Sequence, residues 1–221
     1  MESVGFKEWG IVCEALGRGR QSIILRKGGI AEGRGGFSFR QREFFLFPTF
    51  FHEQPAKVRE AGRRGSTDSS RCETDIEFPA GSDDKIDIGF FAKLELVKTI
   101  TSWKTAQALE PLHILKREVV RERFEYDKVP GLKVGFVRVF RVVPPWTFAN
   151  EKSYGGCRSW VKLPEPAGEL RFELVLDDAE HARRRNEFNE IIQRAEAFAA
   201  CAKPALRREC PARPRFLPEY D

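Results

Sequence analysis

Two basic residues and a pair of glycines stand directly after an apolar run near the N-terminus. The run is Ser-Ile-Ile-Leu over residues 22–25, and Arg26, Lys27, Gly28 and Gly29 follow it. A strand that ends in charge and then in glycine brings basic side chains and backbone amides close to an anion. The pattern predicts a binding site for an anionic, phosphate-bearing ligand.

Arg138 extends this prediction because it falls inside an otherwise apolar segment. A guanidinium buried there needs a carboxylate, backbone carbonyls or a ligand phosphate beside it. An internal salt bridge, with Glu14 or Glu32 as partner, is the alternative interpretation. The predicted ligand-binding residues, hydroxyl contacts included, are Arg26, Lys27, Gly28, Gly29, Thr49, Arg138, Arg158 and Ser159.

A phosphoester hydrolase is the rival hypothesis. Its catalytic groups would come from the set Glu32, His52, Glu14 and Cys157. Cys157 follows two glycines and precedes Arg158, a cation that can lower the pKa of a thiol. His52 or His113 would then serve as the base. A small buried thiol is the commoner role for such a cysteine.

Two metal-dependent patterns are only partly present. A nuclease-like set would use Asp87, Glu95 and Lys98, but residues three apart on a strand point to opposite faces unless a bulge intervenes. A Nudix-like hydrolase site would use Glu53 and residues 59–60. The sequence lacks the remaining carboxylates of the cluster that binds magnesium in such a site. No Cys and His spacing matches a zinc site. We therefore predict no metal site, and the sequence specifies neither a cofactor nor an oligomeric state.

Composition places these residues on a globular, mildly basic protein. The 221 residues are 41% hydrophobic with 19 Phe, and the net charge is +5. That length supports one substantial core, and the charge favours anionic partners such as nucleic acid. The five Cys form no Cys-x-x-Cys pair, and we see neither a secretory signal nor a run of 18 apolar residues. We expect a cytoplasmic protein in a reducing compartment, with no membrane partner.

Periodicity predicts the elements that must position these groups. We expect helices over residues 6–16, 54–61 and 102–109, and a last helix capped by Asp177. We expect strands over residues 21–26, 44–47 (stopped by Pro48), 86–100 and 157–163, and a hairpin of residues 119–126 and 132–143 that ends at Pro144. The mixed order predicts an α+β fold with a mixed or antiparallel central sheet flanked by helices. Residues 1–203 would form a single domain with a mobile loop at 62–75, and residues 204–221 a Pro/Arg-rich tail.

Several strings together resemble a bacterial family, the domain of unknown function 1802 (DUF1802). They are Glu-Ala-Leu-Gly-Arg-Gly at residues 14–19, Ile-Leu-Arg-Lys-Gly-Gly-Ile at 24–30, Leu-Phe-Pro-Thr at 46–49, Leu-His-Ile at 112–114, Val-Arg-Val-Phe-Arg at 137–141 and Tyr-Gly-Gly-Cys-Arg-Ser-Trp at 154–160. The resemblance implies a domain over most of the chain but no reaction. The family follows its Phe-Pro-Thr string with an aromatic residue and then Glu-His-Gln, whereas this chain has Phe51 in place of the acid and Glu53 displaced by two positions.

The leading hypothesis is thus a binding protein for a nucleotide or nucleic acid, with the hydrolase or a partner-binding scaffold as alternatives. It makes a spatial prediction. The cations and acid/base groups should converge on one cleft, rather than be neutralised one by one by internal carboxylates.

Overall fold

The computed structural model describes residues 3–27, 37–51, 53–59, 84–156 and 158–201. Seven strands form one sheet within these ranges. They are β1 (Val4–Trp9), β2 (Ile23–Arg26), β3 (Glu43–Thr49), β4 (Lys85–Ile100), β5 (Leu132–Ala149), β6 (Trp160–Lys162) and β7 (Arg171–Leu174). The helices are α1 (Gly10–Gly17), α2 (Trp103–Ala108), α3 (Arg117–Glu125) and α4 (Asp178–Cys201), with short 3-10 turns at Gln54–Lys57, Glu110–Leu112 and Lys152–Tyr154.

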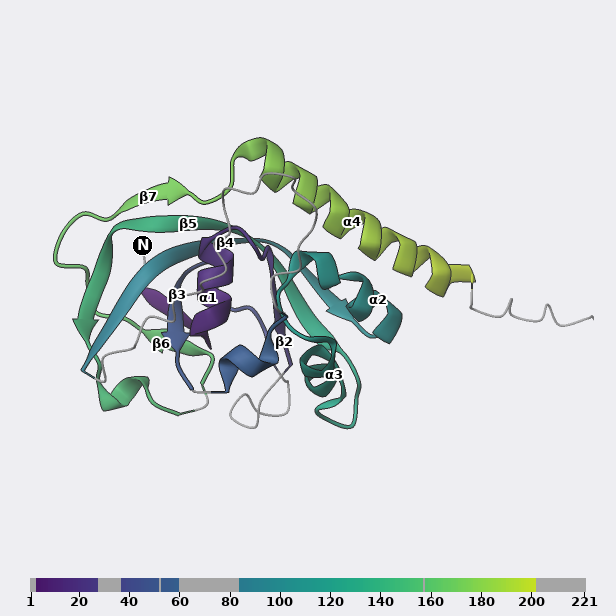
Figure 1. Ribbon diagram of the computed structural model, residues 1–221, viewed down its shortest axis with the longest axis horizontal. Coiled ribbons are helices and arrows are strands. Elements are labelled where there is room, and N and C mark those ends of the chain that lie inside the picture. Colours follow the sequence, from purple (N-terminus) through teal and green to yellow (C-terminus); the bar gives the residue numbers. More distant parts are fainter. Residues whose placement is uncertain (1–2, 28–36, 52, 60–83, 157, 202–221) are drawn as a thin grey trace, which may run out of the picture.

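The sheet is mixed and runs in the order β2-β5-β4-β3-β1-β6, with β7 also paired to β5. Strands β1 and β3 are parallel, and every other pairing is antiparallel. The parallel register sets Trp9 opposite Thr49, so these two strands end side by side. Figure 1 shows α1 lying against the curved sheet and α4 running past its edge. The predicted α+β class with a mixed sheet and flanking helices is confirmed.

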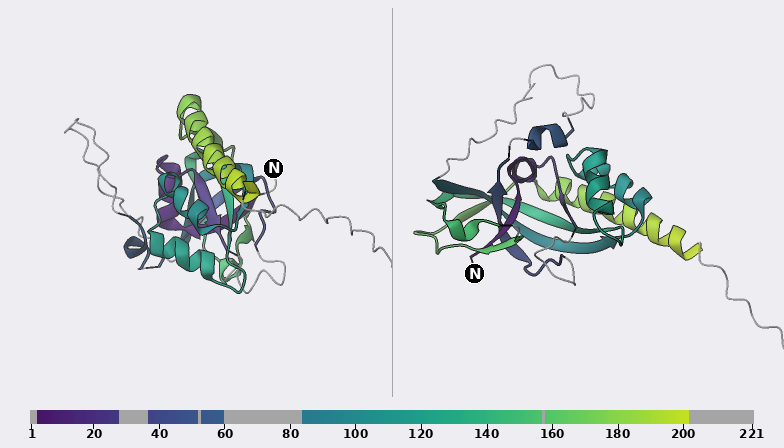
Figure 2. Two further views of the ribbon diagram at one scale, coloured as in Figure 1. Left: turned by 90° about the vertical axis from the view of Figure 1, so that its right-hand side faces the viewer. Right: turned by 90° about the horizontal axis from the view of Figure 1, so that it is seen from below.

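Two apolar cores form on the two faces of this sheet. The larger core joins β1, β2 and β5 to the four helices through residues such as Phe6, Leu16 and Phe136, all fully buried. The smaller core gathers aromatic residues around Phe91 and Trp146 on the opposite side. The long strands β4 and β5 are curved, as the right-hand view in Figure 2 shows. Burial on both faces explains why β5 is apolar on both sides.

The structure corrects the predicted helix over residues 6–16. Its first part is β1, and only Gly10–Gly17 is helical. The predicted first hairpin arm, residues 119–126, is also wrong because this stretch is α3. Its buried residues Val119, Val120 and Phe124 pack against the larger core. The first stretch had a helical spacing but begins as a strand, and the second had a strand-like pattern but forms a helix. In both places tertiary packing outweighed the local pattern.

Prolines do not end β3 and β5, although the sequence analysis predicted that they would. Strand β3 continues through Pro48 to Thr49, where it pairs with β1 alone. In β5, Pro144 and Pro145 fall where the pairing with β4 jumps between Arg141 and Trp146. A proline lacks a donor, so a bulge tolerates it without the loss of a ladder bond.

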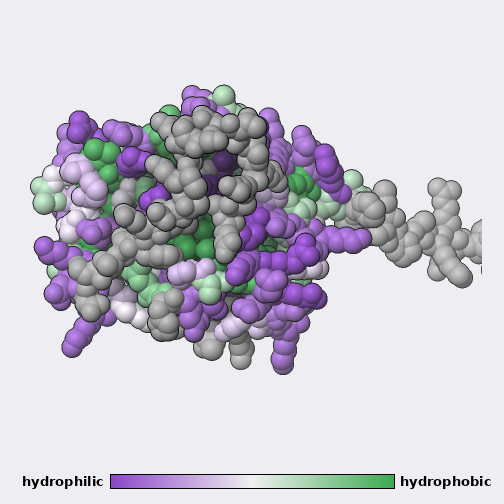
Figure 3. All heavy atoms as spheres, in the orientation of Figure 1, coloured by the Kyte–Doolittle hydropathy of each residue, from purple (hydrophilic) through white to green (hydrophobic). Residues whose placement is uncertain are grey.

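The predicted helix over residues 54–61 is wrong in its described part, which is a 3-10 turn at Gln54–Lys57 followed by the extended residue Val58. Further predictions are confirmed or lie outside the described residues. The predicted strands at 21–26 and 86–100 and the helix at 102–109 correspond to β2, β4 and α2. The loop at 62–75 and the tail at 204–221 lie outside the described residues. None of the helices in the described part of the chain is long and apolar enough for a bilayer crossing. In Figure 3, hydrophilic side chains gather where α2 and α3 lie in Figure 1.

Candidate functional site

A buried carboxylate stands at the end of β1. Glu8 is 1% exposed, and its Oε1 accepts a hydrogen bond of 2.9 Å from the backbone amide of Trp9. Two guanidinium groups approach it from different elements. Arg26 Nη1 lies 3.8 Å from Oε2, and Arg123 Nη2 lies 3.8 Å from Oε1. We call Glu8, Arg26 and Arg123 the arginine cluster.

Arg26 reaches this cluster from the end of β2. Its Nη2 donates a 2.8 Å hydrogen bond to the Ser159 hydroxyl, and its guanidinium carbon lies 5.0 Å from the centre of the Phe6 ring. The Nε atom is buried and has no hydrogen-bond partner among the described residues. A buried donor without an acceptor is costly, by about 1–3 kcal/mol. Arg26 therefore has a buried donor from which no described residue accepts.

Arg123 reaches the same carboxylate from α3. Its Nη1 donates 2.9 Å to the carbonyl of Leu25, and its guanidinium lies 4.4 Å from the centre of the Trp9 ring. Burial lowers the pKa of Arg123, the Glu8 charge opposes that shift, and Arg26 adds to it. An arginine stays protonated despite such shifts. Two guanidinium groups thus share one carboxylate, which leaves one positive charge in excess.

Exposed aromatic residues lie beside the arginine cluster. The rings of Trp9 and Phe51 meet edge to face at 5.3 Å. Phe51 is 39% exposed and Phe50 42%, which is high for consecutive large apolar residues. Phe50 lies against Gly10, where an added Cβ would meet its ring at 2.4 Å. Guanidinium groups and accessible rings therefore share one end of the sheet.

The structure brings several of the predicted ligand-binding residues to this end. Arg26 and Ser159 are hydrogen-bonded directly, and the Thr49 hydroxyl donates 3.0 Å to the carbonyl of Glu8. Arg158 precedes Ser159, and its Nη2 lies 3.5 Å from the carbonyl of Ser153. Gly28 and Gly29 lie outside the described residues.

Lys27 and Arg138 are engaged elsewhere. Lys27 lies 3.2 Å from Asp127 and contacts the carbonyls of Phe124 and Val129, so it closes the C-terminal end of α3. Arg138 forms an ion pair with Asp178 at the start of α4. Arg138 thus has a salt-bridge partner, but that partner is exposed and is neither Glu14 nor Glu32. Convergence of the cations is partial.

The predicted catalytic groups are not assembled by the described residues. Glu32, His52 and Cys157 lie outside them, and Glu14 pairs with Arg18 at 3.4 Å one helical turn away. Within the described ranges, no three His, Cys, Asp or Glu side chains gather as a metal site.

The nuclease-like and histidine candidates are also engaged elsewhere. Glu95 contacts His181 at 3.1 Å and Lys98 contacts Glu196 at 3.0 Å, so both anchor α4. His113 is buried, and its Nδ1 accepts from the amide of Leu115. These contacts give the residues packing roles.

Sequence reasoning missed Glu8, Trp9 and Arg123. Glu8 and Trp9 fell in the predicted helix, where a charged residue reads as exposed, and Arg123 fell in the predicted hairpin arm. The available signal was the strand period of Val4, Phe6 and Glu8, which places Glu8 on the face of a buried Phe.

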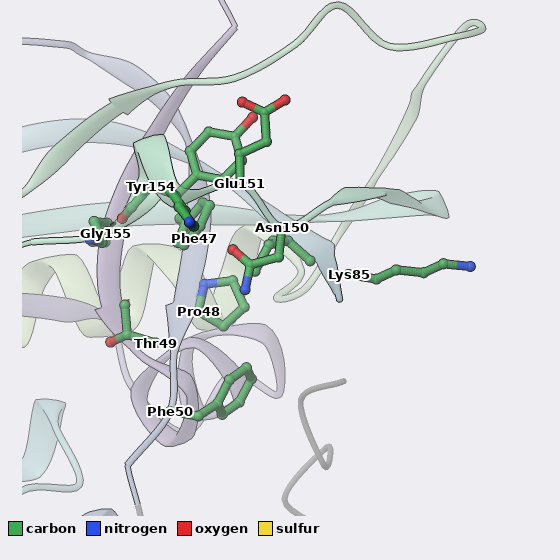
Figure 4. Close-up of a pocket in the computed structure, with 12 residues that line it drawn as sticks. Phe47, Pro48, Thr49, Phe50, Lys85, Asn150, Glu151, Tyr154 and Gly155 are labelled. Carbon is green, nitrogen blue, oxygen red and sulfur yellow. Dashed lines mark hydrogen bonds between the residues drawn. The ribbon is translucent and has the colours of Figure 1, made fainter. Parts of the chain in front are cut away.

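A pocket opens where β3 ends. It has a volume of about 540 Å³ and is lined by Thr49, Phe50 and Tyr154 among others. Figure 4 shows Tyr154 and the Glu151 carboxylate on one side of it, Thr49 and Phe50 on the other, and Lys85 directed away. Burial raises the pKa of Tyr154, and Glu151 adds to the shift. Tyr154 therefore keeps its phenolic proton at neutral pH.

Comparison with known proteins gives one family and one set of remote structures. The Domain of unknown function (DUF1802) matches residues 5–187. None of the curated proteins compared with the chain matches it. The crystal structure of ASCH from Zymomonas mobilis is similar with 13% identity and a TM-score of 0.42, over 74% of this chain and 89% of that one. Two mutants of that Zymomonas mobilis protein have 11% and 12% identity, TM-scores of 0.39, and cover 83% and 75% of this chain and 93% and 92% of theirs.

Proposed function

This chain belongs to the DUF1802 family, and we propose that it binds a phosphate-bearing ligand, a nucleotide or nucleic acid, at the arginine cluster. One observation carries the proposal. Arg26 and Arg123 share a single buried carboxylate, so the cluster holds more positive charge than Glu8 neutralises. A phosphate oxygen beside the two guanidinium groups would supply the missing negative charge.

The hydrogen bonds of the cluster support the same proposal. Arg26 Nη2 donates to Ser159 and Nη1 forms an ion pair with Glu8 at 3.8 Å, while Nε has no hydrogen-bond partner among the described residues. Because Nε is buried, an anion would accept from it after the guanidinium turns toward solvent, and that contact would satisfy the donor. The half-buried Trp9 ring and the exposed Phe51 ring beside Arg123 offer contacts to a base attached to the phosphate.

Matched arginine variants test the proposal. The side chains of Arg26 and Arg138 are equally exposed, at 21% each, and both pair with one carboxylate. We would titrate adenosine monophosphate, and a single-stranded oligonucleotide of about twelve nucleotides, into the intact protein at low salt. Arg26→Ala should weaken binding by about tenfold or more, the loss of a charged hydrogen bond, and Arg138→Ala by less than about twofold.

Two results would overturn the proposal. In one, the intact protein binds neither probe at low salt. In the other, Arg26→Ala and Arg138→Ala weaken binding equally, which would mean that general positive charge and not the cluster attracts the ligand. Circular dichroism of both variants separates a local effect from unfolding.

A further inference from the structure

We infer that the site continues from Phe50 into a groove that accepts a single-stranded nucleic acid, several nucleotides long. This inference rests on the proposed function, because the arginine cluster would hold one phosphate and the groove would hold the chain that follows it. It adds a polymeric ligand and a second set of contacts.

The groove consists of two adjoining pockets. The first, of about 540 Å³, begins at Thr49 and Phe50, and the second, of about 450 Å³, holds Arg158 and Lys162. Both pockets are lined by Glu151 and Tyr154, so they share a wall. Together they extend from the end of β3 along the edge strand β6, whose Lys162 pairs with Val4 at the start of β1. A single nucleotide does not require a site this long.

The groove also adjoins the arginine cluster at two points. Thr49 lines the first pocket and donates its hydroxyl hydrogen bond to the carbonyl of Glu8. Arg158 lines the second pocket, and the next residue, Ser159, accepts from Arg26. Lys7 and Phe47 of the first pocket face the side of the sheet opposite to Phe6 and Glu8, so a chain bound in the groove reaches the cluster around the ends of β1 and β3.

Charge favours a polyanion in this groove. Its lining includes the cations Lys7, Lys85, Lys152, Arg158 and Lys162. Lys85 points away from the pocket in Figure 4. The acid in the lining, Glu151, accepts a 3.1 Å hydrogen bond from the Ser153 hydroxyl. Among the described residues of the lining, four cations stand against one carboxylate, which suits a chain of phosphates whose counterions these cations would release.

The neighbouring aromatic residues favour unpaired bases over an acidic peptide. Phe50 lines the first pocket and Phe51 follows it, and both expose about two fifths of their surface. Bases of a single strand stack on such rings whatever their sequence, whereas the bases of a duplex are already stacked on each other. Glutamate side chains would use the cations but not the rings.

A length series tests the inference. We would measure binding of single-stranded oligonucleotides of about two, four, eight and twelve nucleotides, and of a duplex of about twelve base pairs, at one low salt concentration. The groove predicts that eight nucleotides bind at least about tenfold more tightly than two, and that the duplex binds more weakly than the single strand. Polyglutamate, added as competitor, should displace the oligonucleotide poorly.

Two double variants with the same change in net charge localise the effect. Arg158→Glu with Lys162→Glu reverses exposed groove cations, and Lys104→Glu with Arg194→Glu reverses exposed cations on α2 and α4. The groove variant should weaken the eight-nucleotide complex by about tenfold or more and leave the two-nucleotide complex within about twofold. The control variant should affect both lengths equally and slightly.

A stacking variant gives a second readout. Phe50→Ala should weaken the eight-nucleotide complex by about fivefold or more, and Phe50→Tyr, which keeps the ring, should restore binding. Thermal melting checks that Phe50→Ala stays folded, since this ring packs on Gly10.

The outcomes separate the inference from the proposed function. Affinity that is independent of length but lost in Arg26→Ala would overturn the groove and leave the arginine cluster as the binding site. Equal competition by polyglutamate, or equal effects of the two double variants, would also overturn it. If no nucleotide of any length binds, both the groove and the proposed function are wrong.

Discussion

Arg26 and Arg123, 97 positions apart in the sequence, hold the two oxygens of one buried carboxylate. Arg26 approaches Oε2 of Glu8 and Arg123 approaches Oε1, each at 3.8 Å. The contact ties the end of β2 to α3 through the end of β1. It also concentrates positive charge beside exposed aromatic rings.

Neutralising the shared carboxylate should destabilise the protein. Glu8→Gln keeps an acceptor for the Trp9 amide but leaves two guanidinium groups without a counter-charge. We expect the free energy of unfolding in urea to fall by about 2–3 kcal/mol, at the lower end for a broken buried pair because both arginines keep some solvent contact. Added inorganic phosphate should recover part of this loss, because an anion would replace the missing charge.

Glu14→Gln is the matched control for this prediction. Its ion pair with Arg18 is partly exposed and joins successive turns of α1, so its loss should change stability by less than about 0.5 kcal/mol. Equal stability of Glu8→Gln and the wild type would contradict the account, since the arginines would then not depend on Glu8.

A second prediction concerns the contact between α1 and β4. A Cβ added at Gly17 would lie 2.1 Å from ring atoms of Phe90, whereas one added at the neighbouring Gly89 meets nothing within 4 Å. Gly17→Ala should therefore lower the free energy of unfolding by about 1–3 kcal/mol, the usual cost of overpacking, and Gly89→Ala should not. Urea denaturation of both variants measures the difference. Equal stabilities would mean that Phe90 moves aside freely.

The pH dependence of stability should contain a contribution from His113. Burial lowers the pKa of His113 to about 3, and Arg59 and Arg123 add to the shift. The unfolded chain takes up this proton near pH 6.5, so stability is complete above that pH and falls as the pH drops toward 3. The titration of His113 changes the free energy of unfolding by at most about 1.4 kcal/mol per pH unit.

His113→Asn isolates this contribution. Asparagine retains an acceptor for the Leu115 amide but does not titrate. Below pH 6.5 the wild type should lose stability faster than the variant in urea titrations. Arg183 and Arg184 lower the pKa of Glu180 to about 2. Protonation of Glu180 at low pH therefore also reduces the stability, but it does so equally in the wild type and the variant. Parallel curves for the two proteins would contradict a buried, neutral His113.

Elements whose local pattern agreed with their packing could be predicted from the sequence. Strand β4 alternates apolar and polar residues, and the start of α4 carries Asp177, whose Oδ1 accepts 2.8 Å from the amide of Glu180 as a cap should. Strand β1 was assigned wrongly, because the helical spacing of Trp9, Val12 and Leu16 was extended back over the strand alternation of Val4, Phe6 and Glu8. The pairing of β1 with β3 and β6 fixes the strand, and a local pattern does not contain that pairing.

The candidate site was predictable only in its local parts. Arg26 could be predicted because it is a charged residue directly after an apolar strand. Its partner Ser159 belongs to the sequence motif at residues 154–160 that resembles the family. Glu8 and Arg123 join Arg26 through tertiary contacts between segments far apart in the chain. Glu8 fell in a stretch that was assigned to a helix, where a charge indicates an exposed residue, so the counter-charge of the site was not found.

The most direct test of the account follows the side-chain Nε–H signal of Arg26 by NMR while adenosine monophosphate is added. Protein labelled with ¹⁵N-arginine supplies the signals, and Arg26→Lys and Arg138→Lys variants assign them. We predict that the Arg26 signal shifts when a phosphate oxygen approaches its guanidinium, while the Arg138 signal, held by Asp178, stays in place. A ligand that binds without moving the Arg26 signal would contradict the arginine cluster as the binding site.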